Sequence, residues 1–132
     1  MNTVKIQIPS LLENIRIVES FIDNAKDKFK ISDDVYGNIM ISVTEAVSNA
    51  IKHGNKLSKD KNVTLTLELS EKQITFLVED EGEGFDTENI ADPTLPENID
   101  KPGGRGIFLI QALTDGFNFH DNGRKLELIF NV

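Results

Sequence analysis

Residues 62–80 alternate between apolar and polar side chains on both sides of a short turn. Every second residue is apolar before and after the Ser-Glu-Lys-Gln turn: Val63, Leu65, Leu67, Leu69, Ile74, Phe76 and Val78. A period of two is typical of strands that bury one face. Two such strands joined by a short turn predict an antiparallel hairpin. The chain therefore needs other elements that cover the apolar face of a sheet.

Two segments before the hairpin carry a helical period instead. Apolar residues recur every three or four positions, at Leu11, Ile15, Val18, Ile22, Ala25 and Phe29 in the first segment, and at Val35, Ile39, Val43, Ala46 or Val47 and Ala50 in the second. The pair Ser10 and Glu13 has capping-box spacing and predicts the start of the first helix. Residues 32–34, Ser-Asp-Asp, predict the start of the second helix, and Gly54 is expected to end it.

The remaining patterns complete the order of elements. A strand that ends at Pro9 precedes the helices, and a short helix over residues 106–113 follows the hairpin. The Asp-Asn-Gly sequence at 121–123 predicts a second hairpin. Residues 81–104 hold three of the four prolines and show no period, and a loop of that length is usually functional. We predict one α+β domain over residues 1–132, a two-layer sandwich of a mixed, mostly antiparallel sheet covered on one face by three helices.

The composition excludes several classes of protein. The 132 residues include no cysteine, which excludes disulfides and thiolate chemistry. No apolar run approaches the ~18 residues that a membrane helix needs. The first residues also lack the basic and apolar regions of a signal peptide. We therefore expect a cytoplasmic protein that does not contact a membrane.

The net charge of −8 comes from one segment of the chain. Nine acidic residues and no Lys or Arg lie between Glu79 and Asp100, so the rest of the chain has a net charge of +1. Nucleic-acid binding needs clustered Lys and Arg for the phosphates. The charge therefore argues against a direct nucleic-acid partner, and any account of function has to explain the acidic segment.

The second predicted helix carries Glu-Ala-Val-Ser-Asn-Ala-Ile-Lys-His-Gly at residues 45–54. Glu45 and Asn49 are four residues apart and share a helix face. A carboxylate next to a carboxamide can act as a base beside a Mg²⁺ ligand, because hard cations prefer oxygen donors. The alternative is an ordinary solvated helix face. His53 carries less information, since a helix C-terminus favours histidine without any function.

The sequence Asp-Glu-Gly-Glu-Gly-Phe at residues 80–85 follows the end of the predicted hairpin. Gly82 and Gly84 let the backbone bend or approach a ligand closely. Asp80 can accept a hydrogen bond from an exocyclic amine. An acidic turn without function is the alternative. The spacing of the acids does not match an EF-hand calcium loop, and no helix precedes it.

The third motif is Gly-Gly-Arg-Gly-Ile-Phe-Leu-Ile at residues 103–110. A glycine-rich turn that enters a helix offers free backbone N–H groups and the positive end of a helix dipole, which suits phosphate. The candidate phosphate-binding residues are Gly104, Arg105 and Gly106. The spacing fits neither the dinucleotide-binding fingerprint nor the Walker loop, and many loops place glycine before a helix for structural reasons alone.

The three motifs in this order resemble the N box and the two glycine boxes of the GHKL, or Bergerat-fold, ATPases. The resemblance runs from the second helix to the C-terminus. Within that superfamily, residues 45–54 and 104–110 look most similar to the anti-sigma factor serine/threonine-protein kinases of bacteria. The resemblance implies a histidine-kinase-like ATPase fold, with ATP and Mg²⁺ as the ligands of the site.

The resemblance also implies a role for each matching residue. Glu45 would be the base toward the attacking hydroxyl, Asn49 would hold Mg²⁺, and Asp80 would accept from the adenine amino group. Gly82 and Gly84 would let the chain pass close to the nucleotide. Gly104 and Gly106 would offer N–H groups to the phosphates, Arg105 would add charge there or face a partner, and residues 86–103 would form a lid.

The implied function is a protein-serine kinase that binds a sigma factor and phosphorylates a STAS-type anti-sigma factor antagonist. Relatives in that family are often dimers, so a homodimer is implied as well. Two alternatives remain, a non-catalytic ATP-dependent partner-binding module and a GHKL-type ATP hydrolase. The chain also departs from many relatives, which have Gly-Thr at the turn into the last strand, because here Gly123 is followed by Arg124.

Overall fold

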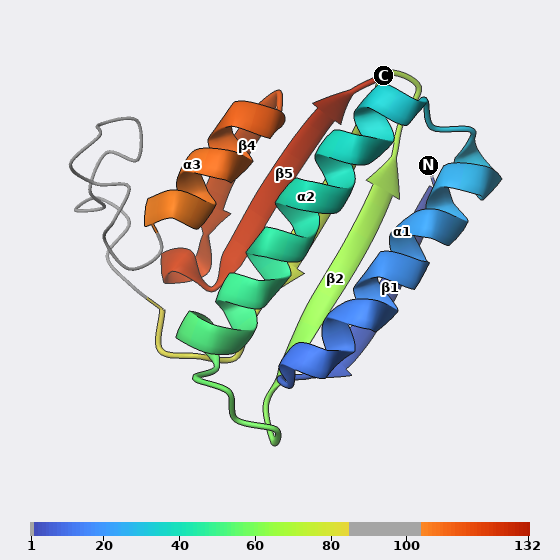
Figure 1. The fold of residues 1–132 in the computed structure, drawn as a ribbon. Coiled ribbons are helices and arrows are strands. Elements are labelled where there is room, and N and C mark those ends of the chain that lie inside the picture. The colour runs from blue at the N-terminus through green and yellow to red at the C-terminus, as the bar shows by residue number, and fades with distance from the viewer. Residues whose placement is uncertain (1, 85–103) are drawn as a thin grey trace.

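The computed structural model describes residues 2–84 and 104–132, and its elements follow the predicted order (Figure 1). In chain order they are β1 (Asn2–Pro9), α1 (Ile15–Phe29), α2 (Asp33–Asn49), β2 (Asn62–Leu69), β3 (Gln73–Glu79), α3 (Gly104–Leu113), β4 (Gly116–His120) and β5 (Lys125–Asn131). Within these residues no helix has the length and apolar character needed to cross a bilayer.

The described strands form one sheet in the order β1-β2-β3-β5-β4. The predicted hairpin is confirmed, since β2 and β3 pair antiparallel with Leu65 opposite Val78 and Leu67 opposite Phe76. Each neighbouring pair in the described sheet is antiparallel. The described sheet is thus antiparallel throughout, where we expected a mixed, mostly antiparallel one. The reason is that β5 returns between β3 and β4 and runs opposite to both.

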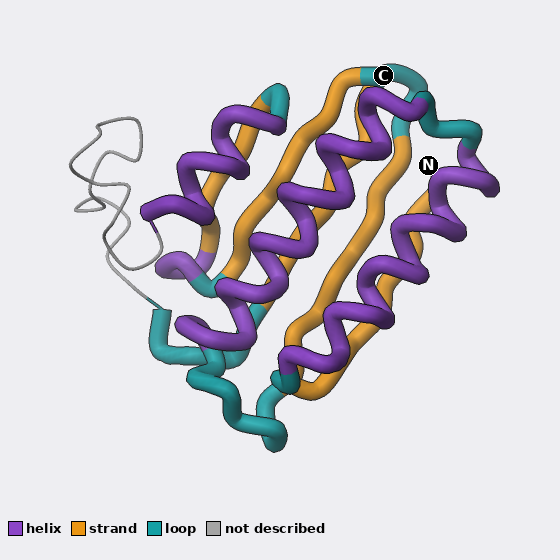
Figure 2. Tube along the Cα trace, in the orientation of Figure 1, coloured by secondary structure: helices purple, strands orange, loops and turns teal. Residues whose placement is uncertain are grey.

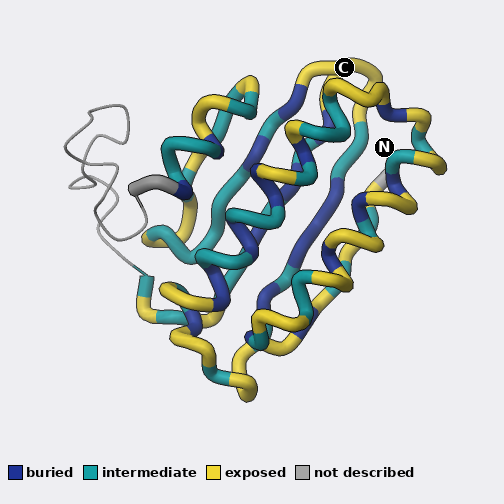
Figure 3. Tube along the Cα trace, viewed as in Figure 1, coloured by how far each residue is buried: buried dark blue, intermediate teal, exposed yellow. Residues whose placement is uncertain are grey.

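The three described helices lie side by side on one face of the sheet (Figures 1 and 2), which confirms the predicted two-layer architecture. Among the described residues, the buried hydrophobic ones belong to one core cluster. Figure 3 shows buried positions in dark blue on both the strands and the helices. The largest fully buried members are Phe76, Phe130, Ile22, Ile39, Ile51, Leu65, Leu67, Ile110 and Leu128. Phe76 and Phe130 meet edge to face in neighbouring strands, with ring centroids 6.2 Å apart.

The start of α1 differs from the prediction. Ser10 does not cap the helix. Its hydroxyl donates to the Lys61 carbonyl at 2.6 Å and the side chain is fully buried. A 3₁₀ turn over Leu12–Asn14 precedes α1, which begins at Ile15. Tertiary hydrogen bonds therefore take the place of the local cap. The prediction for Ser32 is confirmed, since its hydroxyl accepts from the Val35 N–H at 3.5 Å.

The C-terminal end of α2 continues into one π-helical turn over Ala50–Gly54, which confirms Gly54 as the end of the helical segment. The Asn55 N–H closes this turn by donating to the Ala50 carbonyl at 2.8 Å. At the same end of the strands, β4 and β5 are joined by the predicted turn at residues 121–123, where Asn122 and Gly123 have φ angles of 54° and 84°. These two turns surround the end of β3.

Candidate nucleotide site

The predicted base and the predicted metal ligand lie next to the first turn of α3. Glu45 and Asn49 are one turn apart on α2, which packs against α3. A Cβ built on Gly106 would lie 2.5 Å from Glu45 Oε1 and 2.6 Å from Asn49 Nδ2. Real Cβ atoms essentially never approach below 3.0 Å, so the absence of a side chain at Gly106 is what permits this approach.

This contact brings three predicted site residues together from two helices that are far apart in sequence. The first N–H groups of a helix have no intrahelical partner, and the dipole makes that end positive. Because Gly106 belongs to the first turn of α3, those N–H groups begin beside Glu45 and Asn49. A carboxylate, a carboxamide and anion-attracting N–H groups therefore share one location.

Asp80 lies directly after β3 and is half-buried. Its Oδ1 accepts from the Gly82 N–H at 2.8 Å, and its own N–H donates to the Arg124 carbonyl at 2.9 Å. Burial raises the pKa of the Asp80 carboxyl, while the Gly82 N–H and the charges of Arg124 and Lys61 oppose that rise. A partly desolvated carboxylate of this kind is a strong hydrogen-bond acceptor for a ligand amine.

Two glycines pack against Asp80 and leave no room for a side chain. A Cβ on Gly54 would overlap the Asp80 carboxylate, 2.5 Å from its carboxyl carbon, and a Cβ on Gly82 would overlap the Gly54 carbonyl oxygen. Gly54 follows the N-box helix, so the structure links the N box to the first glycine box through direct backbone contact. Sequence reasoning assigned Gly54 only a helix-ending role.

Gly84 needs glycine for its backbone conformation. Its φ angle is +80°, in the left-handed region that side chains disfavour, and a Cβ there would overlap the Asn122 carbonyl oxygen. The segment after Asp80 is thus held against the turn between β4 and β5.

Arg124 is a site-forming residue that the sequence flagged only as a departure from relatives. Its Nε donates to the Gly82 carbonyl at 2.9 Å and one terminal nitrogen donates to the Glu83 carbonyl at 3.0 Å. The other terminal nitrogen contacts the Asp121 carbonyl at 3.2 Å. The guanidinium therefore fixes the backbone of the first glycine box.

Asn55 was missed by the sequence analysis. The side chain is 1% exposed, and its Oδ1 accepts from the Glu81 N–H at 2.7 Å. An asparagine after a helix-ending glycine is common in loops, so nothing in the sequence distinguished it. The buried contact appears only once the helix end and the strand end are placed together.

Several predicted features lie partly or wholly outside the described residues. The lid at residues 86–103 is one, and nothing is described of the Arg105 side chain, although the backbone of Gly104 and Arg105 belongs to α3.

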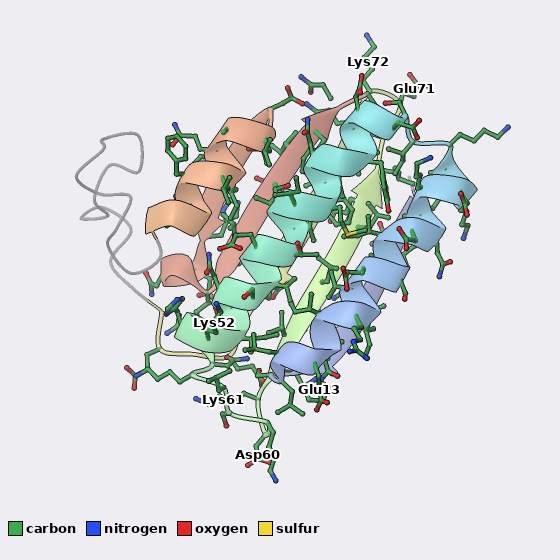
Figure 4. The ribbon with its side chains drawn as sticks, in the orientation of Figure 1. Glu13, Lys52, Asp60, Lys61, Glu71 and Lys72 are labelled. Carbon is green, nitrogen blue, oxygen red and sulfur yellow. The ribbon has the colours of Figure 1, made fainter. Side chains whose placement is uncertain are left out.

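His53 is exposed. Lys52 and Lys61 mark the end of the molecule where α2 finishes, opposite Glu71 and Lys72 (Figure 4).

The donor set suits a magnesium ion that is shared with a phosphate ligand. Among the described residues, no cluster of three or more His, Cys, Asp or Glu side chains is present to enclose a metal. Mg²⁺ in phosphate sites usually has one or two protein oxygens and completes its shell with phosphate and water. The Asn49 carboxamide, beside Glu45 and the start of α3, matches that pattern.

The chain is similar to known proteins in both sequence and fold. The profile of the family described as "Histidine kinase-like ATPase domain" matches residues 8–130. A protein named serine-protein kinase RsbW from Staphylococcus epidermidis is 30% identical, with 96% of this chain and 84% of the relative covered. A protein of the same name from Oceanobacillus iheyensis is 25% identical over 85% of this chain and 75% of its own length.

Two solved structures share the fold. One contains the RsbU and RsbW domains of a Mycobacterium tuberculosis protein, with a TM-score of 0.66 and 12% identity. The other is the histidine kinase domain of a blue-light activated kinase from Erythrobacter litoralis, with a TM-score of 0.56 and 20% identity. The matches cover 99% and 95% of this chain, which spans only 31% and 61% of those two chains. These two structures support the fold and no more.

Proposed function

Because the chain belongs to the histidine kinase-like ATPase domain family and to the group of serine-protein kinases named RsbW, we propose that it transfers the γ-phosphoryl group of ATP to a serine of a partner protein. ATP binding follows from membership of the ATPase family. The acceptor, the partners and the roles of single residues are the proposed part.

The observation that carries the proposal is the contact of Gly106 with Glu45 and Asn49. It supports a transfer centre in which a base, a metal ligand and phosphate-binding N–H groups come together. Asp80, the residue directly after β3, supports an adenine pocket for the ATP whose phosphates would lie at the transfer centre. Phosphoryl transfer relies mainly on positioning and charge neutralisation, and this arrangement offers both.

In the proposed reaction, Glu45 orients the serine hydroxyl and accepts its proton. The hydroxyl oxygen forms the new bond to the γ-phosphorus while the bond to the β–γ bridging oxygen breaks, and ADP leaves. Asn49 would hold Mg²⁺, which neutralises charge on the phosphates when it is bound. The backbone N–H groups of Gly104 and Gly106 and the Arg105 charge would bind the triphosphate, so few lysines are needed.

The partners are proposed from the similarity to the kinases named RsbW. We propose a sigma factor as the protein that is bound and a STAS-type anti-sigma factor antagonist as the protein that is phosphorylated. Such partners place the protein in the cytoplasm. A homodimer is part of the same proposal, and light scattering of the purified protein measures it directly.

The test is incubation with labelled Mg-ATP, with and without the product of the neighbouring gene as the trial acceptor protein. Label on a partner serine supports the kinase. Free phosphate without labelled protein identifies a hydrolase instead. If neither labelled protein nor free phosphate forms, the chain is a binding module. Glu45→Ala should bind ATP but transfer no label, whereas Asn49→Ala should weaken Mg-ATP binding itself. Normal transfer by Glu45→Ala would overturn the assignment of the base.

A further inference from the structure

Asn55 uses its whole side-chain amide inside the protein. The oxygen accepts from the Glu81 N–H at 2.7 Å, and the nitrogen donates to Ser10 Oγ at 2.7 Å and to the Asn62 carbonyl at 3.0 Å. Both N–H donors and the oxygen have partners within the protein, and at 1% exposure the amide is shielded from a ligand. Asn55 therefore acts on the site through other residues.

The position of Asn55 ties the N-box helix to the adenine side of the site. Its own N–H is bonded to the Ala50 carbonyl, one residue after Asn49. The residue before it, Gly54, packs against the Asp80 carboxylate, and the Asn55 side chain holds the N–H of the residue after Asp80. Two consecutive residues thus fix Asp80, one by close packing and one by a hydrogen bond.

The other partners of Asn55 anchor it firmly. The Ser10 hydroxyl donates a hydrogen bond to the Lys61 carbonyl at 2.6 Å, and the Ser10 N–H donates to the same carbonyl at 3.1 Å. The Asn62 N–H in turn donates to the Glu81 carboxylate. Ser10 and Asn55 are the buried centre of this network. Buried groups whose hydrogen bonds are all made are held rigidly and are difficult to replace.

We propose that Asn55 is a positioning residue for adenine recognition, because it fixes the Asp80–Glu81 peptide so that the Asp80 carboxylate stays aligned with the 6-amino group of the purine. This inference rests on the proposed function, in which Asp80 contacts adenine. It adds that selectivity for a 6-aminopurine depends on a residue that never touches the nucleotide.

The readout is a ratio of two affinities. ATP and purine riboside triphosphate differ only in the 6-amino group, so the ratio of their dissociation constants isolates the contact with Asp80. A hydrogen bond to a charged group corresponds to a preference of about 10-fold to 100-fold. Global loosening of the protein weakens both ligands and leaves the ratio largely unchanged.

The experiment measures this ratio by calorimetry in the full chain, in Asn55→Ala and in Ser10→Ala. Asn55→Ala removes three hydrogen bonds and Ser10→Ala removes two from the same network, so both should lower thermal stability. Only Asn55→Ala breaks the bond to Glu81, so its ratio should fall to within about 3-fold of unity while Ser10→Ala keeps the wild-type ratio. If Asn55→Ala does not fold, Asn55→Ser replaces it, because a hydroxyl is too short to keep all three contacts.

Two results would overturn the inference. One is a wild-type ratio in a folded Asn55 variant, and the other is an equal fall in Ser10→Ala. A wild-type protein that binds both nucleotides equally contradicts the proposed contact of Asp80 with adenine, and one that binds neither contradicts the proposed function itself. The failure of the inference and the failure of the function are therefore separate outcomes.

Discussion

Gly106→Ala is expected to separate catalysis from stability. The added Cβ would lie 2.5 Å from Glu45 Oε1 and 2.6 Å from Asn49 Nδ2, where ordinary contact begins at 3.4 Å. Both groups must therefore retreat by roughly 1 Å, and a displacement of that size can cost about 100-fold in rate. The atoms that clash are the ends of side chains, which can rotate, so the protein should still fold.

The stability of the same variant should not fall in parallel. Alanine is favoured over glycine by about 0.5–1 kcal/mol in a helix interior, and part of that gain, available in the first turn of α3, offsets the cost of displacing two side chains. Thermal unfolding should therefore change by only a few degrees. The rate of phosphoryl transfer, measured under single-turnover conditions with the partner protein, should fall about 100-fold.

Gly37→Ala is the matched control. Gly37 also lies within a helix, but a Cβ there would meet nothing within 4 Å. It should gain about the same helix propensity and transfer phosphate at the wild-type rate. Wild-type transfer by Gly106→Ala would refute the assignment of Glu45 and Asn49 to the transfer centre. An equal loss in Gly37→Ala would show that the assay reports helix rigidity.

Three further substitutions test the adenine side. Gly54→Ala should displace the Asp80 carboxylate and weaken ATP binding by about 10-fold or more, and unaltered calorimetric affinity would contradict the packing argument. Because burial raises the Asp80 pKa, Asp80 stabilises the fold most below its unfolded pKa, and this contribution is lost as the pH rises through its folded pKa. Asp80→Asn should therefore remove that decline in unfolding free energy and raise stability at neutral pH, and urea titrations across pH measure both effects. The same variant should lose its selectivity for ATP. ATP affinity should fall at acid pH, where Asp80 is protonated and can no longer accept through a carboxylate. Arg124→Gln removes a charge that lowers the Asp80 pKa, so it should move this fall in affinity to higher pH. An unchanged midpoint of affinity against pH would exclude a role for the Arg124 charge.

The local patterns predicted the elements and their order well. The period-two alternation at 62–80 and the two helical periods before it correspond to β2, β3, α1 and α2. The prediction that Ser10 caps the first helix was wrong. Its spacing to Glu13 suits a cap, but its hydroxyl is hydrogen-bonded to the Lys61 carbonyl and to the Asn55 side chain instead. Capping rules describe an isolated helix end, and a buried tertiary partner overrides them.

The sequence by itself determined the residue types of the candidate site. The sequence alone shows a carboxylate and a carboxamide four residues apart, an aspartate before spaced glycines, and glycines before a predicted helix. Their succession along the chain was enough to indicate the ATPase family, and the match over residues 8–130 confirms it.

Only the tertiary structure decided how those residues depend on one another. Gly106 meets Glu45 across 61 positions of sequence, and Arg124 reaches back 42 positions to the Gly82 carbonyl. Asn55 holds Glu81 across 26 positions. Periodicity and capping act within a few residues of the chain, whereas close packing and buried hydrogen bonds depend on which elements the sheet brings together. The contacts of Gly106, Arg124 and Asn55 therefore become visible only in the fold.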